Sequence, residues 1–405
     1  MPTTQMGTPG PRKTQSCDLG RVVGALLGWG LTYPERYGHR VAINDLNLSD
    51  FRLRVQQFLR ESNDSGIGCR EYGTILPPAL INDAKVWQHA IAEAGFAGID
   101  WNTSHHGQGL SEAHSVIWYE ECAHAGLAPY ANFQGYVLTA GAVRAFGTQE
   151  QVNTHLPHII DGSLIWCQLF SEPGSGSDLS SLRTKAEPDG DGWRITGQKI
   201  WTSTAQVSQW GILLARTDPG SRGARGISFM LIDMNQPEID VRPIRQMTGD
   251  TEFCEVFLDG AYVASEGLLG DAHSGWQVAT SVLADERAAV GAASIRLDRR
   301  LDRLGDDPRT ELRDQGFALR RLLDRSGTNP RLGPLSKLAM TEFETQLSRA
   351  VLDTHGADAM LTNDDTEPFL YAPGMRIAGG SSEVQRDLVG ERLLGLPRSP
   401  KPPSS

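Results

Sequence analysis

Hydrophobic positions recur with two different spacings along the chain, and the change of spacing divides it into three regions. Spacings of three and four residues, typical of helices, run over 51–59, 81–94, 112–125, 135–146 and 148–160. The alternation then becomes that of strands, with candidates at 164–170, 193–203, 210–216, 226–233, 239–243 and 253–258. Helical spacing returns over 277–303, 309–326, 332–355 and 383–394. The pattern predicts an N-terminal helical domain, a central antiparallel β-domain and a C-terminal four-helix bundle.

These changes of pattern set the domain boundaries that we expect. Residues 1–45 contain Pro9 and Pro11 and show little periodicity, so we expect a flexible N-terminal extension there. The remaining boundaries are 46–163 for the helical domain, 164–270 for the β-domain, 271–398 for the bundle and 399–405 for a tail. The predicted fold class is α+β.

A loop of small residues between two predicted strands is the clearest candidate site. The strand at 164–170 leads into 171–178, where a proline and two glycines exclude a helix. Residues 189–192, Asp-Gly-Asp-Gly, predict a hairpin turn, from which the strand at 193–203 returns. Backbone N–H groups and hydroxyls of such a loop can bind a phosphate.

Trp201 lies on the returning strand and offers a flat surface for a flat ring system. A regular strand places Trp201 and Ser203 on one face, because they are two residues apart. An ordinary hairpin with a core tryptophan explains the same pattern, since glycine-rich loops are weak motifs by themselves.

Composition and charge exclude several classes of protein. The chain has 405 residues, 39% hydrophobic and 21% charged, and can therefore bury a large core. A net charge of −11 argues against a general surface for nucleic acids or anionic membranes, although it allows a local basic pocket for a phosphorylated ligand. No apolar run reaches the length of a membrane helix, and residues 1–20 lack the apolar core of a secretory signal.

Cysteines and histidines indicate neither a disulfide framework nor a metal site. The five cysteines are widely spaced and form no CxxC pair, which suits reduced thiols and a cytoplasmic location: Cys17, Cys69, Cys122, Cys167 and Cys254. Four histidines lie close together in the sequence, but their pattern favours solvated or core positions over metal ligands: His105, His106, His114 and His124.

Two runs of sequence resemble the signatures of the acyl-CoA dehydrogenase family. The first is FSEPGSGSD at 170–178, followed by GQKIWTS at 197–203, and the second is IAGGSSEVQR at 377–386. The matching order and spacing extend over about 47–398. The resemblance implies the same three-domain fold, an FAD cofactor, an acyl-CoA substrate and an electron-transfer flavoprotein as the electron acceptor.

The resemblance also assigns residues to the cofactor. It implies that Ser171 hydrogen-bonds the flavin ring, that Trp201 packs beside it, and that Phe170 and Ser203 line it. Within the loop, Gly176 and Ser177 face FAD, with Ser177 at the pyrophosphate. Ser381 and Glu383 match positions that meet the FAD of a neighbouring subunit. Core packing explains Phe170 and Trp201 equally well. Substrate contacts are implied for Ser177, Arg287 and Gly379.

The catalytic base requires a separate decision. Removing a proton from the carbon beside a thioester carbonyl needs a carboxylate, and many family members carry it at the position of Gly379. Other members place it on the first bundle helix just before an arginine, which here gives Glu286 before Arg287. We therefore predict Glu286 as the base. A surface ion pair is the alternative role for Glu286, and Asp285 is turned about 100° away on the helix.

Three departures from the family pattern bear on its details. Glu383 stands where a glutamine would donate to phosphate, and His105 and His106 replace the usual residues of their loop. The Arg-x-x-Phe-Gly segment that reaches a neighbouring FAD is missing from 297–327, where 315–317 is a distant echo. The C-terminal sequence, 378–397, resembles that of a bacterial branch of the family. Some members of this branch form α₂β₂ tetramers, and several act on bulky CoA thioesters such as sterol side chains.

Several readings of the function therefore stay open. The leading one is an active acyl-CoA dehydrogenase that uses Glu286, in a homo-oligomer or an α₂β₂ hetero-oligomer. A partner-dependent subunit and a flavin oxidase or monooxygenase on the same fold are alternatives. A nicotinamide enzyme is disfavoured, because no strand–GxGxxG–helix unit followed by an acidic residue is present in the sequence.

Overall fold

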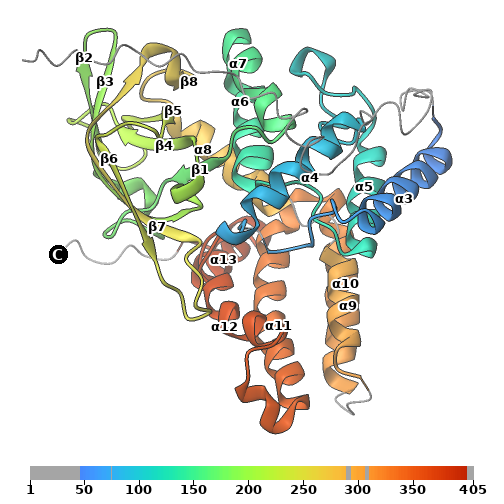
Figure 1. Cartoon of the computed structure of the whole chain (residues 1–405). Helices are drawn as coiled ribbons and strands as arrows, with labels where there is room; N and C mark the ends of the chain where they lie inside the picture. Colours follow the sequence, from blue (N-terminus) through green and yellow to red (C-terminus); the bar gives the residue numbers. More distant parts are fainter. Residues whose placement is uncertain (1–45, 74, 289–292, 306–309, 399–405) are drawn as a thin grey trace, which may run out of the picture. The chain divides into compact units, whose positions relative to one another are not determined.

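The computed structural model describes residues 46–73, 75–288, 293–305 and 310–398. All elements below belong to one compact unit, Leu46–Ser405 (Figure 1). The predicted N-terminal extension, 1–45, and the predicted tail, 399–405, lie outside the described residues.

The first third of the unit is helical, as predicted. Its helices are α3 (Leu48–Asp64), α4 (Ile81–Glu93), α5 (Glu112–Ala125), α6 (Ala140–Phe146) and α7 (Gln149–Ile160). The segment before α6 is a π-helix, Gln134–Thr139, which the helical spacing alone did not distinguish from an α-helix. Such wide turns are uncommon and occur frequently at functional sites.

Helix α7 begins with a capping box that also ties it to the β-domain. The Thr148 hydroxyl accepts a hydrogen bond from Gln151 N, and Gln151 Oε1 accepts one from Thr148 N at 2.9 Å. The Gln151 amide then donates to the carbonyls of Glu266 and Leu268 at 2.7 and 2.8 Å. One buried side chain therefore caps the helix and joins it to the end of the sheet.

The central region forms an eight-stranded sheet in the order β6-β7-β3-β2-β4-β5-β8, with β1 paired to β4. The strands are β1 (Trp166–Leu169), β2 (Lys185–Asp189), β3 (Gly192–Ser203), β4 (Trp210–Arg216), β5 (Ile227–Asp233), β6 (Ile239–Ile244), β7 (Phe253–Ala264) and β8 (Leu268–Leu269). Most neighbours are antiparallel, as predicted, and the β2–β3 hairpin has the predicted turn, whereas β1–β4 and β2–β4 are parallel.

Strand β7 is longer than the sequence predicted. Asp259-Gly260 was expected to end it, but the strand continues to Ala264. Its pairing with β3 shifts register between Ile195 and Thr196, and Gly260 has a φ of +81°. The glycine therefore accommodates a bulge inside the strand and not a chain reversal.

The sheet packs against the N-terminal helices through one core and carries a second core of its own. In the first core Trp166, Phe229 and Leu231 meet Leu138 and Leu156. The second core is formed by strand residues such as Leu213, Val256 and Leu258. Helix α8 (Gly275–Ala288) follows the sheet and contacts both β5 and the π-helix, which brings the first helix of the C-terminal region between sheet and helical domain (Figure 1).

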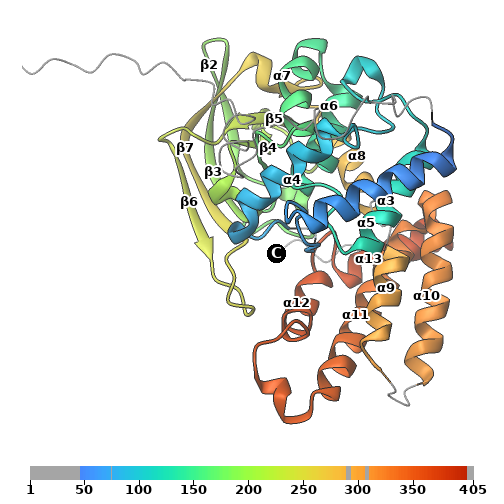
Figure 2. The ribbon, with the colours of Figure 1, turned by 45° about the vertical axis from the view of Figure 1, so that its right-hand side comes forward.

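The C-terminal region consists of α8, α9 (Ala293–Asp302), α10 (Thr310–Thr328), α11 (Gly333–Thr354), α12 (Thr366–Met375) and α13 (Ser382–Leu388). The helix predicted over 277–303 is described as α8 and α9, with 289–292 between them outside the described residues. Helix α12 was missed, because Pro368, Pro373 and Gly374 hide its spacing. Helices α9, α10 and α11 pack side by side around Leu297, Leu319 and Leu347 (Figure 2).

Candidate functional site

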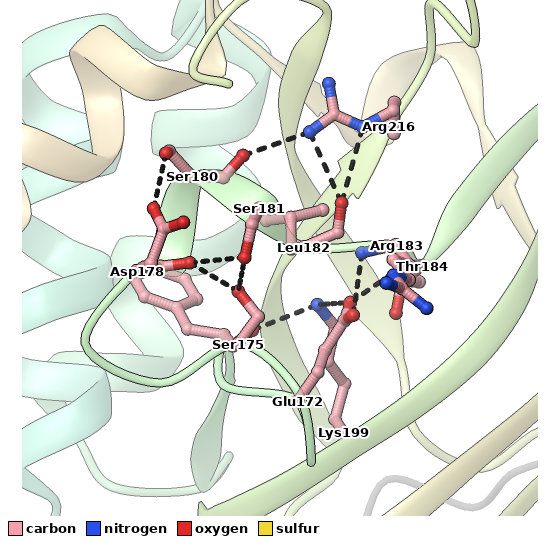
Figure 3. Close-up of polar contacts among 11 residues, drawn as sticks. Glu172, Ser175, Asp178, Ser180, Ser181, Leu182, Arg183, Thr184, Lys199 and Arg216 are labelled. Carbon is pink, nitrogen blue, oxygen red and sulfur yellow. Dashed lines mark hydrogen bonds and ion pairs between the residues drawn. The ribbon is translucent and has the colours of Figure 1, made fainter. Parts of the chain in front are cut away.

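The loop between β1 and β2 folds on itself through short-range hydrogen bonds. Glu172 and Ser175 exchange two backbone hydrogen bonds, each of 3.0 Å. The Ser175 and Ser181 hydroxyls both donate to the carbonyl of Asp178, at 2.7 and 2.8 Å (Figure 3). The small residues that excluded a helix therefore build a compact loop whose own hydroxyls fix its shape.

A buried ion pair joins this loop to β3. Lys199 is fully buried, and its Nζ donates to Glu172 Oε1 and to the carbonyl of Phe170, both at 3.0 Å (Figure 3). Glu172 Oε2 accepts from Arg183 N at 2.6 Å and Oε1 accepts from Thr184 N at 2.8 Å. A single carboxylate therefore receives donors from β3 and from both residues that lead into β2.

Burial and pairing act against each other on these two groups. Burial lowers the pKa of Lys199 to about 8, although the Glu172 carboxylate opposes the shift. Burial alone would raise the pKa of Glu172, but Lys199 and the donors from Thr184 and Arg183 outweigh it and hold that pKa below its usual range. Both groups are therefore charged near neutral pH.

Arg216, at the end of β4, fixes the far side of the same loop. Its guanidinium donates to the carbonyls of Ser180 at 3.1 Å and Leu182 at 3.3 Å (Figure 3). It also reaches the carbonyls of Gly223 and Arg225, at 3.1 and 2.9 Å. The Arg216 guanidinium thus connects the loop before β2 to the loop before β5.

Trp201 occupies an irregular point of β3. Its φ is +60°, and the register between β3 and β7 shifts between Lys199 and Thr202. The indole is 53% exposed and meets the edge of Phe253 at 6.0 Å, whereas Thr202 and Ser203 are both buried. The prediction that Trp201 and Ser203 share one face is therefore wrong, because the bulge interrupts the alternation of the strand.

Other predicted cofactor residues surround this point. Phe170 is buried against Phe229, with ring centroids 5.8 Å apart, so it packs in the core, a role that is compatible with a bound cofactor. Ile200 N donates to the carbonyl of Ser171 at 2.9 Å, which places Ser171 beside the strand residue before Trp201. Ser177 and Gly176 are exposed on the loop. Among the described residues, the side-chain hydroxyls of Ser171 and Ser177 have no hydrogen-bond partner.

The second signature segment is a glycine turn held from two helices. Gly379 and Gly380 have φ values of +64° and +95°, and this backbone geometry favours glycine. Lys337 of α11 donates to the Gly380 carbonyl at 2.7 Å, and Gln385 of α13 donates to the Gly379 carbonyl at 2.9 Å. The turn is thereby fixed by side chains that the sequence did not single out.

Ser381 and Glu383 also have structural roles in this chain. The Ser381 hydroxyl accepts from Val384 N and caps α13. The pKa of the Glu383 carboxyl is lowered, first by its own backbone N–H and then by the Ser381 hydroxyl. Ser381 therefore caps α13, whereas Glu383 is exposed in the first turn of that helix, where its carboxylate lies 3.7 Å from the Arg386 guanidinium.

Glu286 and Arg287 lie in the last turn of α8. The side chains of 283–294 are outside the described residues, so the orientation of the predicted base is not part of this site. Its helix is placed by close packing: a Cβ on Gly275 would fall well within van der Waals contact of Phe229 N and Ser228 C. Helix α8 therefore begins directly against β5.

The segment at 315–317 lies on α10 and packs through its glycine. A Cβ on Gly316 would meet the side chain of Leu301, so the glycine allows α9 and α10 to approach closely. Phe317 is 60% exposed, and the Arg321 guanidinium lies 5.3 Å from its ring centroid. The aromatic residue therefore faces solvent on the outer side of α10.

The described histidines, cysteines and acidic residues form no metal site. Within the described residues no group of three His, Cys, Asp or Glu side chains has a geometry that could hold a metal ion. Cys69, Cys122, Cys167 and Cys254 are buried and free, while Cys17 lies outside the described residues. In the same part of the chain, every helix is too short or too polar to span a bilayer.

Comparison with known families decides what the three regions are. The models of the acyl-CoA dehydrogenase N-terminal, middle and C-terminal domains match residues 50–163, 167–261 and 312–394. Acyl-CoA dehydrogenase IpdE1 of Mycobacterium tuberculosis is 38% identical over 344 residues, which cover 79% of this chain and 89% of that protein. The chain belongs to the acyl-CoA dehydrogenase family.

Its other similarities agree with this membership. Acyl-CoA dehydrogenase IpdE1 of Mycolicibacterium smegmatis is 34% identical over 88% of this chain and 100% of its own length. The ChsE4–ChsE5 complex of Mycobacterium tuberculosis superposes with a TM-score of 0.71 at 26% identity, covering 87% of this chain and 98% of the matched chain. This acyl-CoA dehydrogenase is therefore an oxidoreductase with the family's three-domain fold.

The family is one of flavoproteins, and the residues at the β1–β2 loop fit a flavin. The exposed indole of Trp201 offers a flat apolar surface of the size that a tricyclic ring needs. The free hydroxyls of Ser171 and Ser177 offer donors for ring heteroatoms and for a diphosphate. Glu172, Lys199 and Arg216 hold these groups in place, and the sequence analysis did not identify them. A lysine within a predicted strand, Lys199, was a signal that could have pointed to a buried ion pair.

Proposed function

We propose that the chain removes two hydrogen atoms from the α and β carbons of an acyl-CoA thioester, with FAD as its cofactor. The supporting observation is the hydrogen bond between Ile200 N and the Ser171 carbonyl, which joins the two parts of the first signature, 170–178 and 197–203, at the residues proposed to meet the flavin. When bound, FAD supplies an acceptor for a hydride at N5. We propose an electron-transfer flavoprotein as the acceptor that follows.

In this proposal the described residues bind and orient the flavin and the CoA thioester. Trp201 stacks beside the flavin ring, Ser171 and Ser203 donate to its polar edge, and Phe170 backs it from the core. Ser177, with Gly176 beside it, faces the diphosphate and the CoA thioester. Ser381 and Glu383 of a neighbouring subunit approach the same cofactor, with the glycine turn supplying backbone close to it.

Glu286 is the proposed base. Gly379 has no side chain and cannot accept a proton, so the carboxylate must come from another element, and α8 runs between the sheet and the π-helix. Its role is to take the α-proton while the thioester is held, and Arg287 and Gly379 are proposed to contact the CoA portion. A general base of this kind contributes about 10²–10⁴-fold to the rate.

Product analysis tests the reaction directly. The full chain with FAD, an acyl-CoA and an artificial electron acceptor should release the trans-2-enoyl-CoA, two hydrogens lighter by mass spectrometry. Both a ring-bearing and a straight-chain thioester should be tried, because the sequence resembles a branch that acts on bulky substrates. Hydrogen peroxide or a hydroxylated product, formed with oxygen in place of the acceptor, would favour an oxidase or monooxygenase instead.

A partner-dependent subunit is a second candidate, and the ChsE4–ChsE5 complex supports it because the similar chain there belongs to a complex of two differently named proteins. The missing Arg-x-x-Phe-Gly segment supports it as well, since a partner can supply that part of the FAD site. The test is the visible spectrum of the chain purified alone. A flavin content near one FAD per chain favours a homo-oligomer, whereas a folded chain with little flavin favours a hetero-oligomer.

Buried free cysteines support a cytoplasmic location for either form.

A further inference from the structure

The first signature consists of two separate segments, 170–178 in the β1–β2 loop and 197–203 in β3, and one buried ion pair joins them. We propose that Lys199 and Glu172 are a positioning pair that holds Ser171 and Trp201 in the relative placement that flavin binding requires. This inference rests on the proposed function of the site. Neither residue of the pair is assigned to the flavin itself.

The ammonium group connects the two segments at the points where they matter. Lys199 Nζ lies 3.0 Å from the carbonyl of Phe170, the residue directly before Ser171. Lys199 itself stands two residues before Trp201 on β3. A rotation or shift of either segment would break this bond, so Lys199 couples the position of the loop to that of the indole.

The carboxylate closes the loop at its other end. Glu172 directly follows Ser171 and accepts from Arg183 N and Thr184 N as well as from Lys199. The chain between Glu172 and Thr184 is therefore tied at both ends to one buried carboxylate. Such a loop is already in its folded shape before a ligand arrives, which reduces the entropy lost on binding.

Stability alone is a poor explanation for this arrangement. Removing the charges of a lysine and a glutamate from water costs free energy that a well-packed apolar pair does not have to offset. Buried ion pairs therefore add little net stability. The bonds made here are directional, and three of them go to backbone atoms of the loop. Placement of the loop against the bulge at Trp201 is what such bonds provide and an apolar pair would not.

The test compares two pairs that differ in burial. Lys199→Met removes the ammonium but leaves Glu172 with its two backbone donors, so the chain keeps a bonded carboxylate. Lys185→Met is the matched control, because Lys185 of β2 pairs with Glu187 at 2.8 Å and both are more than half exposed. FAD dissociation constants and the visible spectrum of the bound flavin are measured on the full chain, with the partner subunit present if the wild type needs one.

We expect Lys199→Met to raise the FAD dissociation constant by about tenfold or more and to shift the flavin spectrum, because small misplacements of a binding group are costly. Lys185→Met should change neither. Should Lys199→Met fail to fold, Glu172→Gln is measured in its place, because it removes the charge but keeps an oxygen that accepts from Thr184 N. The same changes in FAD dissociation constant and flavin spectrum are expected for it. A folded variant of either kind with wild-type affinity and spectrum would overturn the positioning role. A wild type that binds no FAD even with its partner subunit present would instead contradict the proposed function and, with it, this inference.

Discussion

Glu286 is the residue on which the proposed chemistry depends most. Glu286→Gln keeps the shape of the side chain but cannot accept a proton, so we predict that enoyl-CoA formation falls by about 100-fold or more while FAD content is unchanged. Stopped assays of product and the visible spectrum of the variant measure the two quantities.

Asp285→Asn is the control for this variant. Asp285 is the adjacent carboxylate on the same helix, turned about 100° away, and its variant should retain wild-type turnover. Normal turnover in Glu286→Gln, or an equal loss in both variants, would remove Glu286 from the role of base.

Lys199 should leave a signature in the pH dependence of stability. Burial lowers its pKa from 10.5 to about 8, so between these values the unfolded chain binds more protons than the folded one. The contribution of this group to the free energy of unfolding therefore rises with pH across that window, by about 3 kcal/mol in all. Urea unfolding at pH 8 and pH 10 measures it.

Lys199→Met is the reference for that measurement, because cysteines and tyrosines titrate in the same range in both proteins. The difference in unfolding free energy between wild type and variant should become more favourable to the wild type as pH rises. A difference that stays constant between the two pH values would show that Lys199 is not a buried cation.

At the scale of single residues, the sequence indicated which residues belong to the candidate site but not which contacts hold them in place. Ser171, Trp201 and the glycines at 379 and 380 could be named from the sequence, because the runs that contain them resemble the signatures of a known family. The roles of Glu172, Lys199 and Lys337 could not, since each depends on contacts between segments far apart in the chain. The irregular backbone at Trp201 was equally hidden, because a strand pattern assumes regular alternation.

At the scale of elements, α8 is placed by its first residue. Gly275 lies where any side chain would meet the backbone of Ser228 and Phe229 in β5. We predict that Gly275→Ala lowers the free energy of unfolding by about 1–3 kcal/mol, because the atoms that the new methyl group would meet are backbone atoms of β5 and cannot move aside easily. Chemical denaturation with the linear extrapolation method measures the change.

Gly73→Ala provides the comparison for that variant. Among the described residues nothing lies within 4 Å of a Cβ at Gly73, and the φ of Gly73 is not positive, so this substitution should change the free energy of unfolding by less than about 0.5 kcal/mol. Equal effects of the two substitutions would contradict the close packing of α8 on the sheet.

Element type and order were predictable because hydrophobic spacing is a local property. The hairpin at 189–192 and the helix at 112–125 were confirmed on turn and spacing signals alone. The errors occurred where glycine or proline has a second use: Gly260 serves a bulge in β7 rather than a turn, and Pro368 and Pro373 lie inside α12. Parallel pairing of β1 with β4 was also hidden, because pairing partners are set by tertiary packing.

At the scale of the whole molecule, the chain carries all three domains of its family in the expected order. The β1–β2 loop, which we propose faces the flavin, is fixed by its own side chains, whereas the glycine turn at 379–380 and the outer face of α10 belong to the C-terminal helices. A second subunit, like or unlike, is proposed to bring such a turn to the cofactor. Assembly and cofactor binding are therefore expected to depend on each other, and flavin content should rise with assembly on size-exclusion chromatography.

Anaerobic reduction of the bound flavin by substrate tests the proposed function most directly. The full chain, loaded with FAD and supplied with its partner subunit if it needs one, is mixed with ring-bearing and straight-chain acyl-CoA thioesters, and the visible flavin absorbance is followed. We predict that at least one thioester bleaches the flavin and yields one enoyl-CoA per flavin. A flavin-loaded protein whose absorbance is unchanged by every thioester would contradict the assignment as an acyl-CoA dehydrogenase that transfers hydride to FAD.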